Sequence, residues 1–312
     1  MTEVVPVSKG EMAIPSLEAP ADSPFSWLRS MTATIRDQML THGAVLIHGL
    51  PIDGPDSLGE ARSFLGIGSF TPIEAFNHRR DFGNNILSPI SWPQDRHICP
   101  VQESSFSRTF PSVVLTACVT PPEGDGRAYL VDARRMLQHL PADLADRVRT
   151  EGWIMNRAFH GGFGISWQQA FSATERGALE ELFKTEGIDS EWTPNDSLLT
   201  TRHRPGIIKH PATGEECWFN QLSFLNASNL DPTERAFMAR AFGKHLPMET
   251  FFGDGSPLSE EDVNAIVHAY DSVRVDLPWR RGDLLIADNM ITALGRSAIE
   301  GSPVFLVALG KD

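Results

Sequence analysis

The chain has 312 residues, of which 41% are hydrophobic and 21% are charged, a composition typical of a globular protein with a sizeable core. Its formal net charge of −13 argues against binding to nucleic acid or to an anionic membrane surface, because both partners require clustered lysine and arginine. We therefore expect a small-molecule substrate, no nucleic-acid partner and no membrane partner.

The cysteines and the N-terminus indicate the compartment. Cys99, Cys118 and Cys217 are odd in number and form no CxxC pair, so the sequence predicts neither a disulfide framework nor a zinc site. The N-terminus is polar and acidic where a signal peptide would be basic and then apolar, and no apolar run approaches the roughly 20 residues of a membrane span. A cytoplasmic location is the expectation.

Helix and strand signals follow one another along the chain without an internal repeat. Residues 1–24 are rich in Pro, Ser and Glu and predict a loosely ordered N-terminal arm, followed by a single domain over residues 25–312. Apolar spacing predicts a helix over 25–42, a strand over 44–50 and a helical stretch over 57–65. Short β-branched runs predict further strands at 113–119, 128–131, 206–209, 216–219, 283–287 and 304–309.

Three later helices have recognisable first residues. The expected N-caps are Ser172, Asp231 and Ser259, and Pro232 stands at the first helical position after Asp231. Strands spread over the whole length, with helices inserted between them, favour a mainly β fold with α decoration, of the jelly-roll type, over a regularly alternating α/β fold.

Several blocks of the sequence resemble one known family in the same order. These blocks are 103–111 (ESSFSRTFP), 121–135 (PPEGDGRAYLVDARR), 166–170 (SWQQA), 201–219 with its HPATGEECWF run, 253–257 (GDGSP) and 278–290 (PWRRGDLLIADNM). Together they are similar to the taurine-dioxygenase-like (TauD/TfdA) superfamily of Fe(II)/2-oxoglutarate oxygenases. The resemblance implies a double-stranded β-helix core, also called a jelly roll or cupin-like fold, with helical insertions.

The family holds its iron with a 2-His-1-carboxylate triad. By the resemblance, its His-x-Asp/Glu motif falls on Val101, Gln102 and Glu103, and its distal histidine falls on Leu294. Only the carboxylate is present, because the side chains of valine and leucine have no lone pair to donate to a metal. The sequence therefore predicts no metal at these positions.

The co-substrate contacts implied by the family also differ. The arginine that grips the 2-oxoglutarate carboxylate would lie near Pro303, Val304 and Phe305, and the assisting threonine corresponds to Ala128. We therefore expect no cofactor, neither Fe(II) nor 2-oxoglutarate. Four histidines are candidates for a replacement ligand: His97, His160, His203 and His210. The pattern favours His160, because His97 would lie about 13 Å from Val101 along a strand and the local sequence of His203 and His210 fits structural roles.

The remaining polar residues predict the site. Glu103 is the expected general acid or base, with the alternative that it is a structural remnant, and His160 is a second catalytic candidate. The expected substrate-binding residues, each with an alternative structural role, are Gln102, Asn220, Gln221, Trp218, Arg202 and Arg296.

Two classes of function follow from this pattern. The first is a degenerate oxygenase-fold enzyme of natural-product metabolism that works without iron or 2-oxoglutarate, in non-redox chemistry such as cyclisation, isomerisation, elimination, condensation or hydrolysis. The second is a non-catalytic pseudoenzyme that binds a metabolite or a partner. A third alternative is an Fe(II)/2-oxoglutarate dioxygenase with an unorthodox metal site. The resemblance implies an amino-acid-derived or carrier-bound substrate, and a homo-oligomer stays open.

Overall fold

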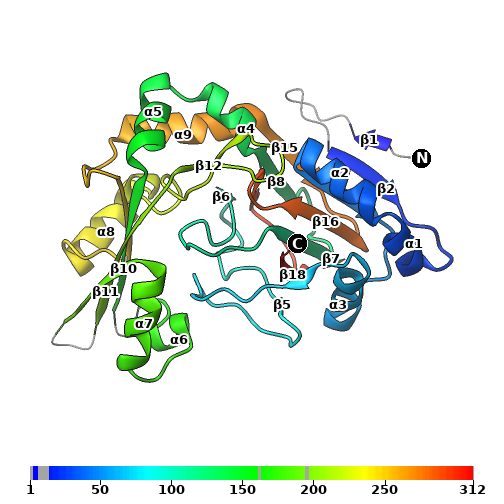
Figure 1. Ribbon diagram of the computed structural model, residues 1–312, viewed down its shortest axis with the longest axis horizontal. Helices are drawn as coiled ribbons and strands as arrows, with labels where there is room; N and C mark the ends of the chain where they lie inside the picture. The colour runs from blue at the N-terminus through cyan, green and yellow to red at the C-terminus, as the bar shows by residue number, and fades with distance from the viewer. Residues whose placement is uncertain (1–2, 6–13, 161–162, 194–196, 312) are drawn as a thin grey trace.

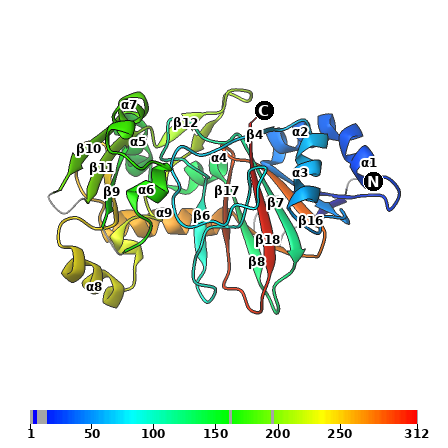
Figure 2. The ribbon, with the colours of Figure 1, turned by 90° about the horizontal axis from the view of Figure 1, so that it is seen from below.

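Two facing β-sheets form the centre of the protein in the computed structural model, which describes residues 3–5, 14–160, 163–193 and 197–311. The larger sheet has eight strands. Seven of them follow one another in the spatial order β1 (Glu3–Val5), β2 (Ile14–Glu18), β3 (Ala44–His48), β16 (Asp283–Asp288), β7 (Val113–Thr120), β18 (Val304–Lys311) and β4 (Gly68–Ser69). The eighth, β5 (Ile86–Leu87), also pairs with β18. The smaller sheet has the order β15 (Arg274–Pro278), β8 (Arg127–Asp132), β17 (Thr292–Arg296) and β6 (Ile98–Val101). Figure 2 shows strands of both sheets in one half of the molecule.

Alternate residues of the strands divide the core into two layers, because successive side chains of a strand point to opposite faces. Leu46 and Leu285 belong to an inner cluster that also contains Leu130 of the smaller sheet. Their neighbours Val45 and Leu284 belong to an outer cluster with residues of three helices. These helices, α1 (Pro24–Ser30), α2 (Thr32–His42) and α3 (Pro55–Phe64), cover the outer face of the larger sheet.

A third sheet lies on the opposite side of the molecule from α1, α2 and α3 (Figure 1). Its order is β10 (Ile188–Trp192), β11 (Leu198–Arg204), β9 (Trp153–Phe159) and β14 (Met248–Phe252). The hairpin of β12 (Ile207–Lys209) and β13 (Glu216–Trp218) follows β11 in the chain. The remaining described helices are α4 (Ala133–Met136), α5 (Ala142–Glu151), α6 (Trp167–Phe171), α7 (Gly177–Glu186), α8 (Pro232–Phe242) and α9 (Glu260–Val273), with 3-10 turns at Leu137–His139 and Ala227–Asn229.

The architecture confirms the expected mainly β, jelly-roll fold with helical insertions, and the predicted N-caps Asp231 and Ser259 are the observed ones. The N-cap predicted at Ser172 is wrong. Ser172 ends α6 in the left-handed region, with φ 50°, and α7 begins at Gly177. The Ser-x-x-Glu spacing is a local signal for a helix start, and it cannot show that Ser172 already ends the preceding helix.

Part of the N-terminal arm forms a strand that the sequence did not predict. Residues 14–18 form β2, which pairs in parallel with β3, and Ile14 and Leu17 are buried. Burial of these two side chains against the larger sheet supplies the stabilisation that the polar composition of the arm did not predict. The expected helix over 25–42 is two helices that meet at Met31.

The three cysteines are free and buried. Among the helices of the described part of the chain, none has the length and apolarity to cross a bilayer.

Candidate functional site

The positions implied for the two metal-binding histidines lie side by side. β6 and β17 are antiparallel neighbours, and Val101 is the direct register partner of Leu294. Directly opposite residues of such a pair have Cβ atoms about 5 Å apart. The structure therefore brings these two positions together as the resemblance requires, but it places an isopropyl and an isobutyl group there.

Glu103 follows β6 in a tight turn, and its backbone is held by one side chain. Oδ1 of Asn289 accepts from the Glu103 N–H at 2.8 Å, and Nδ2 of Asn289 donates to the Glu103 carbonyl at 2.9 Å. The same Nδ2 donates to the carbonyl of Pro111 at 2.8 Å. The next residue, Ser104, has φ 57°, a conformation that is uncommon for a residue other than glycine and that clusters at functional sites.

The Glu103 carboxylate forms an ion pair with Arg79, in which Nη2 donates to Oε1. The Arg79 side chain is 14% exposed and that of Glu103 is 28% exposed, so both are partly shielded from water. Screening by solvent is reduced at such a site, and the interaction is stronger than that of a surface pair. Arg79 thus supplies a positive charge beside Glu103, which is the one implied metal-ligand position that still carries a carboxylate.

Two adjoining cavities meet at this ion pair. The first, here called the barrel-mouth cavity, has a volume of about 150 Å³ and includes Ala128, Leu294 and Phe305 in its wall. The second, here called the glutamine cavity, has a volume of about 290 Å³ and includes Gln102 and Gln221. The residues common to both walls are Arg79, Ile90, Val101 and Glu103. Glu103 is therefore accessible from both sides.

The described residues do not fit an Fe(II) centre at this site. Of the three implied ligand positions only Glu103 carries a donor atom, and its carboxylate is engaged by Arg79. Within the described ranges there is no group of three or more His, Cys, Asp or Glu side chains arranged to hold a metal ion. A ferrous site of this family requires nitrogen donors from two histidines, which the valine and leucine side chains cannot replace.

The barrel-mouth cavity also does not fit 2-oxoglutarate. Ala128 and Phe305 stand at the implied co-substrate contacts, and the Phe305 ring lies 5.1 Å from that of Trp279. Among the described residues of its wall, two carry a guanidinium, Arg79 and Arg296. Arg79 is paired with Glu103, and the partners of Arg296 among the described residues are backbone carbonyls, including those of residues 93, 96 and 297. Bidentate binding of a carboxylate requires a guanidinium that is free to form it.

The predicted substrate-binding residues divide into two groups. Gln102 and Gln221 line the glutamine cavity together with Glu103. Asn220 is buried, with its Nδ2 donating to the Gly206 carbonyl and its Oδ1 accepting from the backbone N–H two residues later. Trp218 is buried in the core, and its indole N–H donates to the hydroxyl of Tyr270 at 3.2 Å. Asn220 and Trp218 line neither cavity and hold the segment that carries Gln221.

Arg202 lies behind the site and anchors the segment that carries Arg79. It forms a buried ion pair with Glu74, which also pairs with Arg157. Arg157 further donates to the carbonyls of Ala75 and Phe76. Burial lowers the pKa of Arg157, and the Glu74 carboxylate opposes that shift. These contacts hold residues 74–76 against the third sheet. Removal of one member of such a network would leave an uncompensated buried charge.

His160 lies apart from Glu103. Its Nε2 is 2.7 Å from the carbonyl oxygen of His245, and its ring stacks on that of Phe242 with centroids 4.8 Å apart. It lines neither the barrel-mouth cavity nor the glutamine cavity. We therefore do not include it in the site with Glu103.

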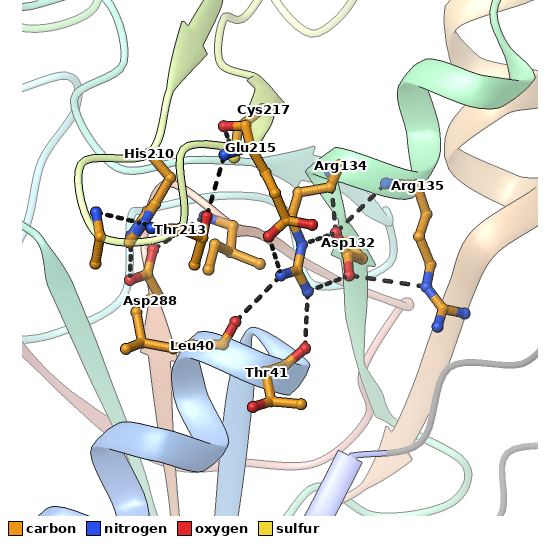
Figure 3. Close-up of polar contacts among 12 residues, drawn as sticks. Leu40, Thr41, Asp132, Arg134, Arg135, His210, Thr213, Glu215, Cys217 and Asp288 are labelled. Carbon is orange, nitrogen blue, oxygen red and sulfur yellow. Dashed lines mark hydrogen bonds and ion pairs between the residues drawn. The ribbon is translucent and has the colours of Figure 1, made fainter.

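A polar cluster supports the turn between β16 and β17 from behind (Figure 3). Oδ1 of Asp288 accepts from two backbone N–H groups of this turn, and its Oδ2 is 3.1 Å from Nε2 of His210. Nδ1 of His210 accepts from the N–H of Ala212 and of Thr213, so the proton of a neutral ring lies on Nε2. His210 thus connects the β12–β13 hairpin to the turn that carries Asn289.

Arg134 belongs to the same polar cluster and lies on the side of Glu215. Its guanidinium pairs with Asp132 and Glu215 and donates to the carbonyls of Leu40 and Thr41 (Figure 3). Burial alone would lower the pKa of Arg134, but the hydrogen bonds and charges of Asp132 and Glu215 raise it overall. These contacts bind α2, α4 and the hairpin into one support for the site.

The sequence did not predict the roles of Arg79 and Asn289. Arg79 lies between His78 and Arg80 in an irregular segment with no motif spacing. Asn289 belongs to a block that resembles the family, but only the folded chain places it against the Glu103 backbone. No local pattern could have found either partner, since both contacts join residues distant in sequence.

Asn289→Leu is expected to lower the free energy of unfolding by about 2–4 kcal/mol, because it removes one buried and two partly buried hydrogen bonds and takes the side-chain partner from the Glu103 N–H and from two carbonyls. Urea denaturation followed by circular dichroism measures the change. The matched control is Asn264→Leu on the exposed face of α9, for which the expected change is within about 0.5 kcal/mol. Equal effects of the two substitutions would contradict the role of Asn289.

The fold and this site define the class of protein. Residues 12–308 match the family model "Taurine catabolism dioxygenase TauD, TfdA family", and the chain belongs to that family. It is 29% identical over 275 residues to the dapdiamide synthesis protein DdaC of Enterobacter agglomerans, with 88% of this chain and 84% of that one covered. It is 22% identical to a clavaminate synthase-like protein of Arabidopsis thaliana, with 99% and 93% covered.

Solved structures show the same fold. A putative alpha-ketoglutarate-dependent taurine dioxygenase from Burkholderia xenovorans superposes with a TM-score of 0.54 at 16% identity, with 100% of this chain and 93% of that chain covered. An asparagine oxygenase in complex with Fe(II), 2S,3S-3-hydroxyasparagine and succinate superposes with a TM-score of 0.56 at 14% identity, covering 91% and 79%. At these identities the likeness concerns the fold alone.

Proposed function

We propose that this family member is an enzyme of small-molecule metabolism that catalyses a non-redox reaction without Fe(II) or 2-oxoglutarate, with Glu103 as its acid or base. The observation that carries the proposal is the Arg79–Glu103 ion pair in the wall common to two cavities, beside the apolar pair Val101 and Leu294. Cyclisation, isomerisation, elimination, condensation and hydrolysis all require a proton transfer that one positioned carboxylate can perform.

The arrangement suits Glu103 to accept a proton from a bound substrate. Arg79 engages Oε1, and among the hydrogen bonds of the described residues none uses Oε2 of Glu103. In the proposed step Oε2 takes a proton from a carbon, nitrogen or oxygen of the substrate and later returns it to the product. Asn289 holds the backbone of Glu103 and so limits the positions that its side chain can reach.

The setting in natural-product metabolism is supported by the similarity to DdaC, whose name assigns it to dapdiamide synthesis. We extend to this chain only the general setting of small-molecule synthesis.

Product masses test the proposal. Purified protein would be incubated with a panel of amino-acid-derived metabolites, in the presence of a metal chelator and without oxygen, and the products analysed by mass spectrometry. The proposal expects a product of unchanged mass, one that differs by water or by loss of a leaving group, or one that joins two substrates with loss of water. Turnover that requires added Fe(II) and 2-oxoglutarate, releases succinate and inserts an oxygen atom would refute it in favour of an oxygenase with other metal ligands.

A further inference from the structure

A further cavity, here called the aromatic cavity, adjoins the glutamine cavity. Its volume is about 340 Å³. It shares Phe76, Asn77 and Phe224 with the wall of the glutamine cavity, whereas among the described residues it has no wall residue in common with the barrel-mouth cavity. The glutamine cavity, with Glu103 in its wall, therefore lies between the other two. A molecule held at Glu103 has the aromatic cavity as its neighbour.

Aromatic side chains form much of the wall of this cavity. They belong to Phe76, Trp92, Phe159, Phe163 and Phe224. The Phe224 ring lies 5.3 Å from that of Trp92 and 5.8 Å from that of Phe76, both in tilted arrangements. Such a wall favours an aromatic guest over a saturated one of the same size, because aromatic pairs gain from the charge distribution of their rings as well as from burial.

The polar side chains of the wall are already engaged. The Asn77 amide donates to one backbone carbonyl at 2.8 Å and accepts from the next N–H, and the Asn226 amide donates to a carbonyl and a hydroxyl and accepts from a backbone N–H. Arg157 pairs with Glu74 and donates to two further carbonyls. The indole N–H of Trp92 has no partner among the described residues, but it is buried and so is not presented to the cavity.

The cavity is therefore unsuited to a charged group. Arg157 is the one cation among the described residues of its wall, and its guanidinium is paired, so an anion would find no free ion partner there. The same part of the wall contains no carboxylate that could compensate an ammonium group. Either ion would lose its hydration without an equivalent gain.

Some apolar surface of the wall is left uncovered by the protein. Phe163 is 40% exposed although it lines the cavity. Met238 of α8 lines it as well, and α8 has no buried residue among those described. A group that fills the cavity would remove apolar surface of both side chains from water, which is favourable.

We propose that the aromatic cavity binds an uncharged aromatic group of the substrate, whose reacting end lies in the glutamine cavity beside Glu103. The assignment rests on the proposed function, because it takes the glutamine cavity as the place of reaction. The volume of about 340 Å³ lies within the range of small-molecule sites. The substrate class that follows is a small molecule with an uncharged ring at one end and the reacting group at the other.

Titration of the full chain with three probes, followed by ligand-observed NMR, tests the proposal. The probes are 2,6-naphthalenedimethanol, its saturated analogue decahydro-2,6-naphthalenedimethanol, and naphthalene-2,6-dicarboxylate, which is charged at whichever end enters the cavity. We expect the aromatic diol to bind at least about threefold more tightly than the saturated diol and at least about tenfold more tightly than the dicarboxylate. A smaller preference over either probe, or no binding of the aromatic diol at millimolar concentration, overturns the proposal.

Phe163→Ala locates the bound ring. We expect the affinity for 2,6-naphthalenedimethanol to fall about fivefold or more, because the substitution removes an apolar contact of the wall. The matched control is Phe237→Ala, another exposed phenylalanine, which does not line the cavity and should leave the affinity unchanged. Met238→Ala tests a second part of the wall, with an expected loss of about threefold. Circular dichroism checks that each variant is folded, and an unchanged affinity in either folded wall variant overturns the assignment to this cavity.

Failure of this inference is distinguishable from failure of the proposed function. Binding of the aromatic diol is measured without turnover, so selective binding that depends on Phe163, without any non-redox product, would leave the aromatic site standing and refute the function. Non-redox turnover of substrates that contain no ring, by a protein that does not bind the aromatic diol, would refute the inference and leave the function.

Discussion

Replacing Glu103 with Gln is expected to lower kcat of the non-redox reaction by about 10²–10⁴-fold, the contribution of a positioned general acid or base. Glutamine keeps the shape of the side chain but cannot exchange a proton in this way. Because the ion pair with Arg79 is also lost, KM is a useful second readout. A change in kcat with little change in KM is the pattern expected when the group acts in the chemical step.

The control for this substitution is Glu181→Gln, at an exposed position of α7, which should leave kcat unchanged. Arg79→Met in turn removes the charge that compensates the carboxylate, and we expect it to lower activity less than Glu103→Gln. If Glu103→Gln turns over substrate at the rate of the unmodified protein, Glu103 is not the acid or base of the reaction.

Replacing both Val101 and Leu294 with His is expected to create a divalent-metal site together with Glu103. The two positions are direct register partners, and Glu103 adds the carboxylate of a facial triad. Loss of a residue that merely orients a ligand costs about 10–100-fold in metal affinity. Gain of two ligands should therefore raise affinity for Co(II) by more than about 100-fold, measured by calorimetry and by the visible absorption of bound cobalt.

Two further variants sharpen this result. Val101→His alone should bind Co(II) weakly, because it supplies one nitrogen. Adding Arg79→Met to the double variant should strengthen binding, because Arg79 competes with the metal for the Glu103 carboxylate. A folded double variant that binds no better than the unmodified protein would show that these three side chains do not converge. Stoichiometric Fe(II) binding by the unmodified protein would show that other ligands hold iron.

The sequence by itself determined the family, the chemistry of the three implied ligand positions, and the strands β3, β7, β8, β12, β13, β16 and β18. Short β-branched runs coincide with the strands of the two facing sheets, such as β7 and β16, because side-chain alternation and burial are local signals. Val101 and Leu294 exclude metal coordination by their own side chains wherever they lie, since the absence of a lone pair does not depend on the fold.

Local patterns were weaker where tertiary packing decided the outcome. No expectation covered the third sheet of β9, β10, β11 and β14, whose strands carry charged residues. Arg202 and Arg157 lie on two of these strands and are buried only because Glu74 meets them from a distant segment. From sequence alone a charged residue is expected to be exposed, because its burial depends on a partner that the sequence does not identify.

The site itself was decided by tertiary structure. The sequence supplied Gln102, Glu103 and Gln221 as candidates, but it could not show that Arg79 would pair with Glu103 or that Asn289 would hold its backbone. It also could not show that Asn220 and Trp218 differ from these residues, because their polar groups form hydrogen bonds inside the core. Whether a polar atom is available depends on what surrounds it in space, and only the folded chain brings those surroundings together.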